Sequence, residues 1–196
     1  MTQLKDLFFI DLTEEEYHKI LHYVDTYLPW DWMLKHDSGE LGIPENELNP
    51  NTKGVLGECA LGKYEGKPVE QILKERPIRE SDTGWDIVIG DLKYDIKTLQ
   101  TIRRPDLHFR YNVLKSTINK HKANDGYIWV SMVVYVGRTV PFYWLVTGWM
   151  LKDEFLEKAI LHEIGELSMT GNQFIYEVPT YDIGIKELHP FKAIPR

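Results

Sequence analysis

The sequence contains a single cysteine, Cys59, and no apolar run long enough to cross a membrane. One cysteine cannot form an intrachain disulfide, and this usage suits a reducing compartment. A membrane-spanning helix needs about 18–20 predominantly apolar residues, and the best candidate, 127–136, is interrupted by Ser131. Residues 1–6 also lack the basic, apolar and small-residue pattern of a secretory signal. We therefore expect a cytoplasmic protein with no membrane association.

Several catalytic motifs are missing as well. The sequence has no G-x-S-x-G, no glycine-rich phosphate loop ending in Lys-Ser/Thr, and no Cys/His spacing typical of a zinc site. Residues 162–166 begin like the helix of a zinc protease, but the second histidine of that motif is absent. We therefore expect this segment to lie on the surface. Internal repeats and low-complexity segments are also absent.

What the sequence does contain predicts one folded domain with an uneven charge distribution. Its 196 residues are 43% hydrophobic and 12% aromatic, which argues against disorder. The net charge is −7, yet residues 1–50 hold eleven acidic and three basic residues, whereas residues 93–122 hold eight basic and two acidic ones. A basic stretch in an acidic chain favours a phosphate-bearing substrate. A solvated helix face is the alternative.

Residues 84–97 form the stretch on which the functional prediction depends. Two runs of alternating apolar and polar residues flank Gly90-Asp91, the signal for a two-residue hairpin turn. This turn would place Ile87 opposite Tyr94. The apolar face of the hairpin would carry Trp85, Ile87, Ile89, Leu92, Tyr94 and Ile96, and the other face Asp86, Val88, Lys93, Asp95 and Lys97.

The polar face of this hairpin is a candidate metal site. It sets Asp86 opposite Asp95, and like charges at directly opposed positions are destabilising. Two facing carboxylates beside the Lys97 ammonium are better tolerated if a cation lies between them. The alternative is a solvated hairpin face with a weak ion pair between Asp95 and Lys97.

A second helix is predicted just upstream, over residues 53–64. It includes Glu58 among small and apolar residues, an expensive place for a carboxylate without a partner. Packed on the sheet, this helix would project Glu58 towards Asp86. A glutamate on an exposed helix face is the alternative.

The remaining elements follow from periodicity and capping signals. A first helix begins after Thr13, with Glu16 at the capping-box position, and ends before Pro29. Residues 67–76 are a short amphipathic segment or loop. The other predictions are strand character continuing to residue 101, a helix over 111–122, buried strands over 127–136 and 142–150 joined by a hairpin, a helix over 152–161, and an extended tail from residue 174.

With these elements in order, the chain resembles the PD-(D/E)xK nuclease superfamily. The matching residues are Asp86, then Asp95-x-Lys97 after an eight-residue gap, with Gly57-Glu58-Cys59-Ala60 similar to the G-E-x-A helix of many members. Thr83-Gly84-Trp85 replaces the proline-containing lead-in, and Asp95 stands where many members carry Glu. The resemblance spans roughly residues 53–150.

The resemblance implies an α/β, restriction-endonuclease-like fold with a central mixed sheet of four to five strands flanked by helices. We expect a single domain over 1–196, divided into an acidic N-terminal extension (1–52), a catalytic core (53–150), and a C-terminal helix and extended tail (151–196).

It further implies a metal-dependent deoxyribonuclease. We expect an endonuclease, and exonuclease action stays open as the alternative. Asp86, Asp95 and the Ile96 carbonyl would hold Mg²⁺, or Mn²⁺ in its place, because these hard cations prefer oxygen ligands. Glu58 would complete the ligand set or recruit a second metal, and Lys97 would orient or deprotonate the attacking water or neutralise developing charge. The expected partner is DNA, and a homodimer is an option. The phosphate-binding candidates are Arg103, Arg104, Arg110, Lys115, Lys120 and Lys122. The alternative is a nucleic-acid-binding or assembly protein on the same fold that does not cleave.

Overall fold

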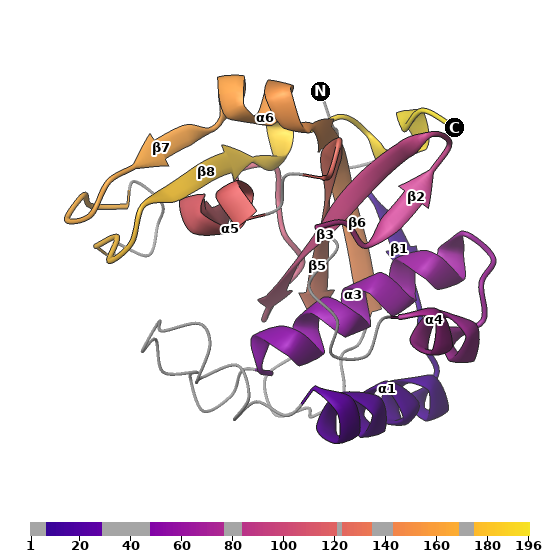
Figure 1. Ribbon diagram of the computed structural model, residues 1–196. Helices are drawn as coiled ribbons and strands as arrows, with labels where there is room; N and C mark the ends of the chain where they lie inside the picture. Colours follow the sequence, from indigo (N-terminus) through magenta and orange to yellow (C-terminus); the bar gives the residue numbers. More distant parts are fainter. Residues whose placement is uncertain (1–6, 29–47, 77–83, 121–122, 135–142, 169–174) are drawn as a thin grey trace.

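The chain is an α/β protein with a mixed five-stranded sheet flanked by helices, as predicted (Figure 1). The computed structural model describes residues 7–28, 48–76, 84–120, 123–134, 143–168 and 175–196. A second sheet of three strands was not predicted. The elements are β1 (Phe8–Ile10), α1 (Glu14–Tyr27), α3 (Pro50–Tyr64), α4 (Val69–Glu75), β2 (Ile87–Ile89), β3 (Leu92–Thr101), β4 (Arg110–Leu114), α5 (Lys115–Lys120), β5 (Gly126–Val133), β6 (Tyr143–Leu151), α6 (Lys152–Lys158), β7 (Ile160–His162), β8 (Thr180–Gly184) and the 3-10 helices η2 (Ile185–Glu187) and η3 (Phe191–Ala193).

The central sheet has the strand order β1-β6-β5-β3-β2, in which β3 and β5 run parallel and every other pair is antiparallel. The hairpin of β2 and β3 has the predicted register, with Ile87 opposite Tyr94 and Ile89 opposite Leu92. Gly90 in its turn has φ of +60°, a conformation that glycine adopts without steric cost. The sequence pattern therefore predicted this ribbon correctly from Ile87 to Tyr94.

The two faces of the central sheet are covered by different layers. Helices α1, α3 and α4 pack on one face, while β4, β8 and α6 pack on the other (Figure 1). Burial along β5 is complete, and β6 is buried up to Met150, which confirms the prediction of strands covered on both sides. The hydroxyl of Tyr111 in β4 lies 2.6 Å from Ser131 Oγ and 2.8 Å from Thr147 Oγ1, which ties the second sheet to the first.

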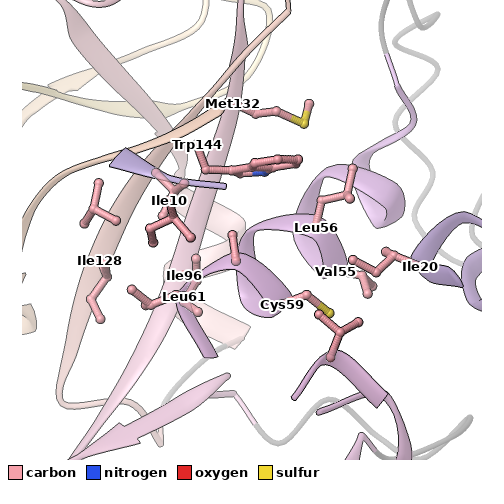
Figure 2. Packing of buried hydrophobic residues seen from close by; sticks show 14 of the residues in the cluster. Ile10, Ile20, Val55, Leu56, Cys59, Leu61, Ile96, Ile128, Met132 and Trp144 are labelled. Atoms are coloured by element: carbon pink, nitrogen blue, oxygen red, sulfur yellow. The ribbon is translucent and has the colours of Figure 1, made fainter. Parts of the chain in front are cut away.

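Helix α3 lies at the centre of the molecule and is buried on most of its surface. It begins at Pro50, three residues before the predicted start, because Asn49 caps it by accepting a hydrogen bond from Thr52 N at 2.8 Å. Its side chains fill the space between the sheet and α1: Val55 lies beside Ile20, and Leu61 beside Ile96 (Figure 2). An all-round buried helix is expected where two layers meet.

Three other predictions need revision or partial revision. Residues 111–114 are strand rather than helix, because β8, almost seventy residues away in sequence, pairs with them. The helix predicted over 152–161 ends at Lys158, and Ile160–His162 is β7 in the second sheet. The tail contains β8 and two 3-10 helices.

The capping box of Thr13 and Glu16 is confirmed, and 67–76 contains the short helix α4. The hairpin turn predicted near 137–141 lies outside the described residues, and no helix in the described ranges has the length and apolar character that a membrane crossing requires.

Two glycines of α3 give a matched test of this packing. A Cβ on Gly57 would overlap the side chain of Thr98 in β3, whereas a Cβ on Gly54 would only reach ordinary contact with Glu58 at 4.0 Å. We expect Gly57→Ala to lower the free energy of unfolding by about 1–3 kcal/mol, because overpacking forces the helix away from the sheet. Gly54→Ala is expected to raise it by up to about 1 kcal/mol through helix propensity. Thermal or urea unfolding of the two variants measures this, and equal effects would show that α3 does not approach β3 at Gly57.

Candidate functional site

Asp86 lies just before β2, where the chain departs from regular pairing with β3. Its backbone N–H donates to the Tyr94 carbonyl at 2.8 Å, and its carboxylate Oδ2 accepts the Ile96 N–H at 2.7 Å. The carboxylate therefore takes the place of a strand carbonyl beside β3. The predicted direct opposition of Asp86 and Asp95 is replaced by this side-chain bond, which brings the Asp86 carboxylate to the edge of β3.

The Ile96 carbonyl is placed at the same edge. Pairing of β2 with β3 ends at Tyr94, so among the described strands none covers this side of β3 from residue 95 onwards. The N–H and C=O of one strand residue point to the same side. Since the Ile96 N–H points to Asp86, the Ile96 carbonyl lies on the Asp86 side too. It supplies an oxygen next to the carboxylate.

Asp95 and Lys97 project from the face of β3 opposite to that of the Ile96 side chain, because side chains alternate between the two faces of a strand. Asp95 is only 4% exposed, and its Oδ2 lies 2.7 Å from the Lys97 Nζ. The Lys97 ammonium also lies 5.9 Å from the centre of the Tyr127 ring on β5. The predicted pair of Asp95 and Lys97 is therefore a close, largely buried ion pair, rather than the solvated one offered as the alternative.

Glu58 reaches the same region from α3, and an arginine holds it. Arg76, at the end of α4, donates from Nε to Oε2 at 2.8 Å and from Nη2 to Oε1 at 2.9 Å. The side chain of Glu58 is 11% exposed and that of Arg76 is 25% exposed. Glu58 is thus not a free helix-surface glutamate. Both of its oxygens are engaged by a two-pronged guanidinium contact, the strong geometry for this pair.

The surroundings of Asp86 disfavour the negative charge of its carboxylate. Desolvation raises the pKa of Asp86 well above its usual range, and the charges of Glu58 and Asp95 raise it further. The Ile96 N–H and the Lys97 ammonium act in the opposite direction. Because the Asp86 side chain is exposed to solvent, we attribute its raised pKa more to the charges of Glu58 and Asp95 than to desolvation. A carboxylate in this setting gains from a bound cation.

These residues fit a hard divalent cation. Among the described residues, no three His, Cys, Asp or Glu side chains are grouped to hold a metal ion. Asp86, Asp95 and the Ile96 carbonyl nevertheless offer two carboxylates and one backbone oxygen, a set that suits Mg²⁺ because this ion keeps several waters. The carboxylate crowding that raises the pKa of Asp86 is the observation that favours a cation here. Glu58 as a ligand stays a prediction.

The predicted phosphate-binding residues are spread over two regions. Arg103 and Arg104 are exposed just beyond β3, where the Arg104 guanidinium lies 5.0 Å from the centre of the Phe9 ring. Arg110 pairs with the buried Asp182 of β8 at 2.6 Å, and Lys115 lies 3.5 Å from Glu163. Lys122 lies outside the described residues, as does the side chain of Lys120. Arg103 and Arg104 are therefore the members nearest to the site along the chain that carry no carboxylate partner in the described contacts.

The surface assignment of residues 162–166 is wrong for His162. This side chain is buried in the second sheet, stacked on Tyr176 with ring centres 4.4 Å apart. Its Nδ1 lies 3.0 Å from Glu166, and its Nε2 lies 3.7 Å from Asp182. Tyr176 and Asp182, which bury the ring, come from β8 and the segment before it, so residues near His162 in the sequence do not indicate its burial.

Sequence reasoning also missed Arg76. Its only local signal is a basic residue at the end of a short helix, which is common. The signal that would have found it is Glu58 itself, because a carboxylate among apolar residues needs a cationic partner.

Comparisons of the chain with protein-family models, with curated proteins and with solved structures each returned no match.

Proposed function

We propose that the protein is a metal-dependent nuclease that hydrolyses phosphodiester bonds of DNA, on a restriction-endonuclease-like fold. The observation that carries this proposal is the convergence of Asp86, Asp95 and Lys97 at the edge of β3 that no described strand covers, with Glu58 adjoining them. A pure binding protein gains nothing from crowded carboxylates next to phosphate. A nuclease needs them to hold the cation that activates water and offsets negative charge.

The reaction assigns distinct tasks to the residues of the site. Hydrolysis joins the oxygen of a water molecule to phosphorus and breaks the bond to the leaving sugar oxygen; the water loses one proton and the leaving oxygen gains one. Asp86, Asp95 and the Ile96 carbonyl would hold Mg²⁺, which when bound supplies an acidic water and charge stabilisation. The Lys97 ammonium lies 2.7 Å from Asp95 Oδ2, and it would orient the attacking water and neutralise charge on the phosphate. To accept the proton of the water, Lys97 would first have to be neutral.

The proposal is tested by incubating the purified protein with linear and with covalently closed circular DNA in Mg²⁺, in Mn²⁺ and in EDTA. We expect cleavage of both DNAs with either metal and none in EDTA, because an endonuclease needs no DNA end. Cleavage of linear DNA alone would indicate an exonuclease. DNA binding without cleavage under every condition would favour the non-cleaving alternative, and neither binding nor cleavage would contradict the proposal.

Arg103 and Arg104 are expected to contact phosphates that flank the cut, because both are exposed and follow the strand that carries Lys97. Replacing both by Ala should weaken binding to every DNA sequence and flatten the slope of log affinity against log salt by about 1–2 units. Binding measured in Ca²⁺ over a salt series tests this without cleavage. Replacing the exposed Lys186 and Lys192 by Ala is the matched control, expected to leave the slope unchanged. A wild-type slope in the Arg103/Arg104 variant would place the DNA elsewhere.

A further inference from the structure

Arg76 is the one residue of the charged cluster that the nuclease proposal leaves without a task. Its guanidinium binds both oxygens of Glu58. Burial lowers the pKa of Arg76, but the charge of Glu58 and then that of Asp86 outweigh it and raise the pKa above its usual value. Gly57, next to Glu58 in α3, lies so close to Thr98 of β3 that a Cβ on it would overlap that side chain. Glu58, and the Arg76 guanidinium bound to it, therefore lie beside the strand that carries Lys97. Arg76 and Lys97 thus contribute two basic side chains to a cluster with three carboxylates.

The charges in this cluster decide what can enter it. The cluster has a net charge of −1 when all three carboxylates (Glu58, Asp86 and Asp95) are ionised beside Arg76 and Lys97, and this charge repels a phosphodiester. A divalent cation on Asp86 and Asp95 changes the net charge to +1, which attracts one. The guanidinium has five N–H donors, and Glu58 takes two of them. The Tyr23 hydroxyl of α1 also lies close to the guanidinium, and a quarter of the Arg76 side chain remains accessible to solvent.

We propose that Arg76 contacts the non-bridging oxygens of the phosphate that is cleaved, and that Glu58 is the positioning residue that aims it rather than a ligand of the cation. This inference rests on the proposed nuclease function and assigns Glu58 a different task from the one that the superfamily resemblance implies. A planar, doubly anchored guanidinium suits this task, because its donors are fixed before charge develops on the phosphate. The phosphate would be bound by N–H donors that Glu58 does not occupy.

The test compares the wild type with Arg76→Ala, Arg76→Lys, Glu58→Gln and, as a control, Lys74→Ala. Lys74 is an exposed cation on the same short helix, two residues before Arg76. Three quantities are measured for each protein: Mn²⁺ affinity without DNA, DNA affinity in Ca²⁺, and the single-turnover cleavage rate in Mg²⁺ at saturating DNA. Thermal melts report whether each variant is folded.

We expect Arg76→Ala to lower the cleavage rate by about 10²–10³-fold, the loss typical of removing one charge-stabilising donor. Its Mn²⁺ affinity should stay within about threefold of wild type or improve, since a neighbouring cation has gone. Glu58→Gln should lower the rate by more than tenfold with unchanged Mn²⁺ affinity, and Lys74→Ala should change nothing. If Arg76→Ala is unfolded, the Arg76→Lys variant tests the inference instead. Lysine keeps the positive charge opposite Glu58 but lacks the planar guanidinium with its paired N–H donors, and we expect its cleavage rate to be at least tenfold lower than that of wild type.

A wild-type rate in folded Arg76→Ala, or in Arg76→Lys if the former is unfolded, would overturn the inference and leave the nuclease proposal standing. A tenfold or greater loss of Mn²⁺ affinity in Glu58→Gln would make Glu58 a metal ligand and would overturn it equally. A wild-type protein that cleaves no DNA would overturn the nuclease proposal, and the inference with it. Whether the wild-type protein cleaves DNA therefore distinguishes the failure of the nuclease proposal from the failure of the inference about Arg76.

Discussion

Replacing Asp86 by asparagine is expected to abolish Mg²⁺-dependent DNA cleavage and to leave the metal-free protein as stable as wild type or more stable. Cleavage is lost because the amide cannot supply the negative charge that binds the cation. Stability is kept because Asn retains an oxygen that can accept the Ile96 N–H, while the repulsion from Glu58 and Asp95 disappears. Asp95→Asn should likewise abolish cleavage. Cleavage assays in Mg²⁺ and thermal melts in EDTA measure the two effects.

The stability gain of Asp86→Asn should depend on pH. The pKa of Asp86 is raised by folding, so the folded state binds its proton more tightly than the unfolded state does. The contribution of Asp86 to stability is therefore most favourable below the unfolded pKa of about 3.9 and is lost as pH rises through the folded value. In EDTA, the melting temperature of the variant should exceed that of wild type most clearly at neutral pH, and the two should converge below about pH 4.

The matched control for this variant is Asp91→Asn, in the turn of the same hairpin. Asp91 is exposed and lies at the opposite end of β2 from Asp86. Its replacement should change neither cleavage nor melting temperature by a measurable amount. Full cleavage by Asp86→Asn would remove Asp86 from the site, and a large loss of stability in EDTA would show that its charge supports the fold.

Replacing Lys97 by alanine is expected to lower the single-turnover cleavage rate by about 10²–10⁴-fold, the range for a group that handles the proton or the charge of the reaction. Mn²⁺ affinity should be retained or improved, because the ammonium that competes for Asp95 at 2.7 Å has been removed. Rates at saturating DNA and Mn²⁺ titrations without DNA separate the two quantities.

Lys93→Ala is the control for Lys97, since Lys93 is an exposed lysine on the same strand and face, next to Trp85. It should cleave at the wild-type rate. An unchanged rate in Lys97→Ala would mean that the ammonium only balances the charge of Asp95. The nuclease proposal would then rest on Asp86 and Asp95 without Lys97. A loss of metal affinity would instead show that Lys97 holds Asp95 in position for the cation.

The elements that sequence predicted best are those specified by neighbouring residues. The hairpin was predictable because Gly90 and the period-two alternation act within a few residues, and the register from Ile87 to Tyr94 followed from them. The same holds for the capping box at Thr13. Because Asp95 and Lys97 are two residues apart on one strand, their shared face was predictable too.

The features that sequence did not predict depend on partners far along the chain. Tyr111 has a helical pattern around it, yet β8 recruits its segment into a sheet. His162 is buried by Tyr176 and Asp182, which reach it only after folding. Arg76 meets Glu58 because α3 and α4 pack side by side. Hydrophobic periodicity indicates which secondary structure a segment favours locally. It contains no information on which distant segment will pack against it.

We propose that Asp86 and Asp95, with the Ile96 carbonyl, bind a divalent cation at the edge of β3 that no described strand covers. Electron paramagnetic resonance counts bound Mn²⁺ directly in the DNA-free protein, because the signal of the free ion falls as the ion binds. We expect at least one bound Mn²⁺ per wild-type chain, lost in both Asp86→Asn and Asp95→Asn and kept in Asp91→Asn. The same number and affinity of bound ions in all four proteins would contradict it.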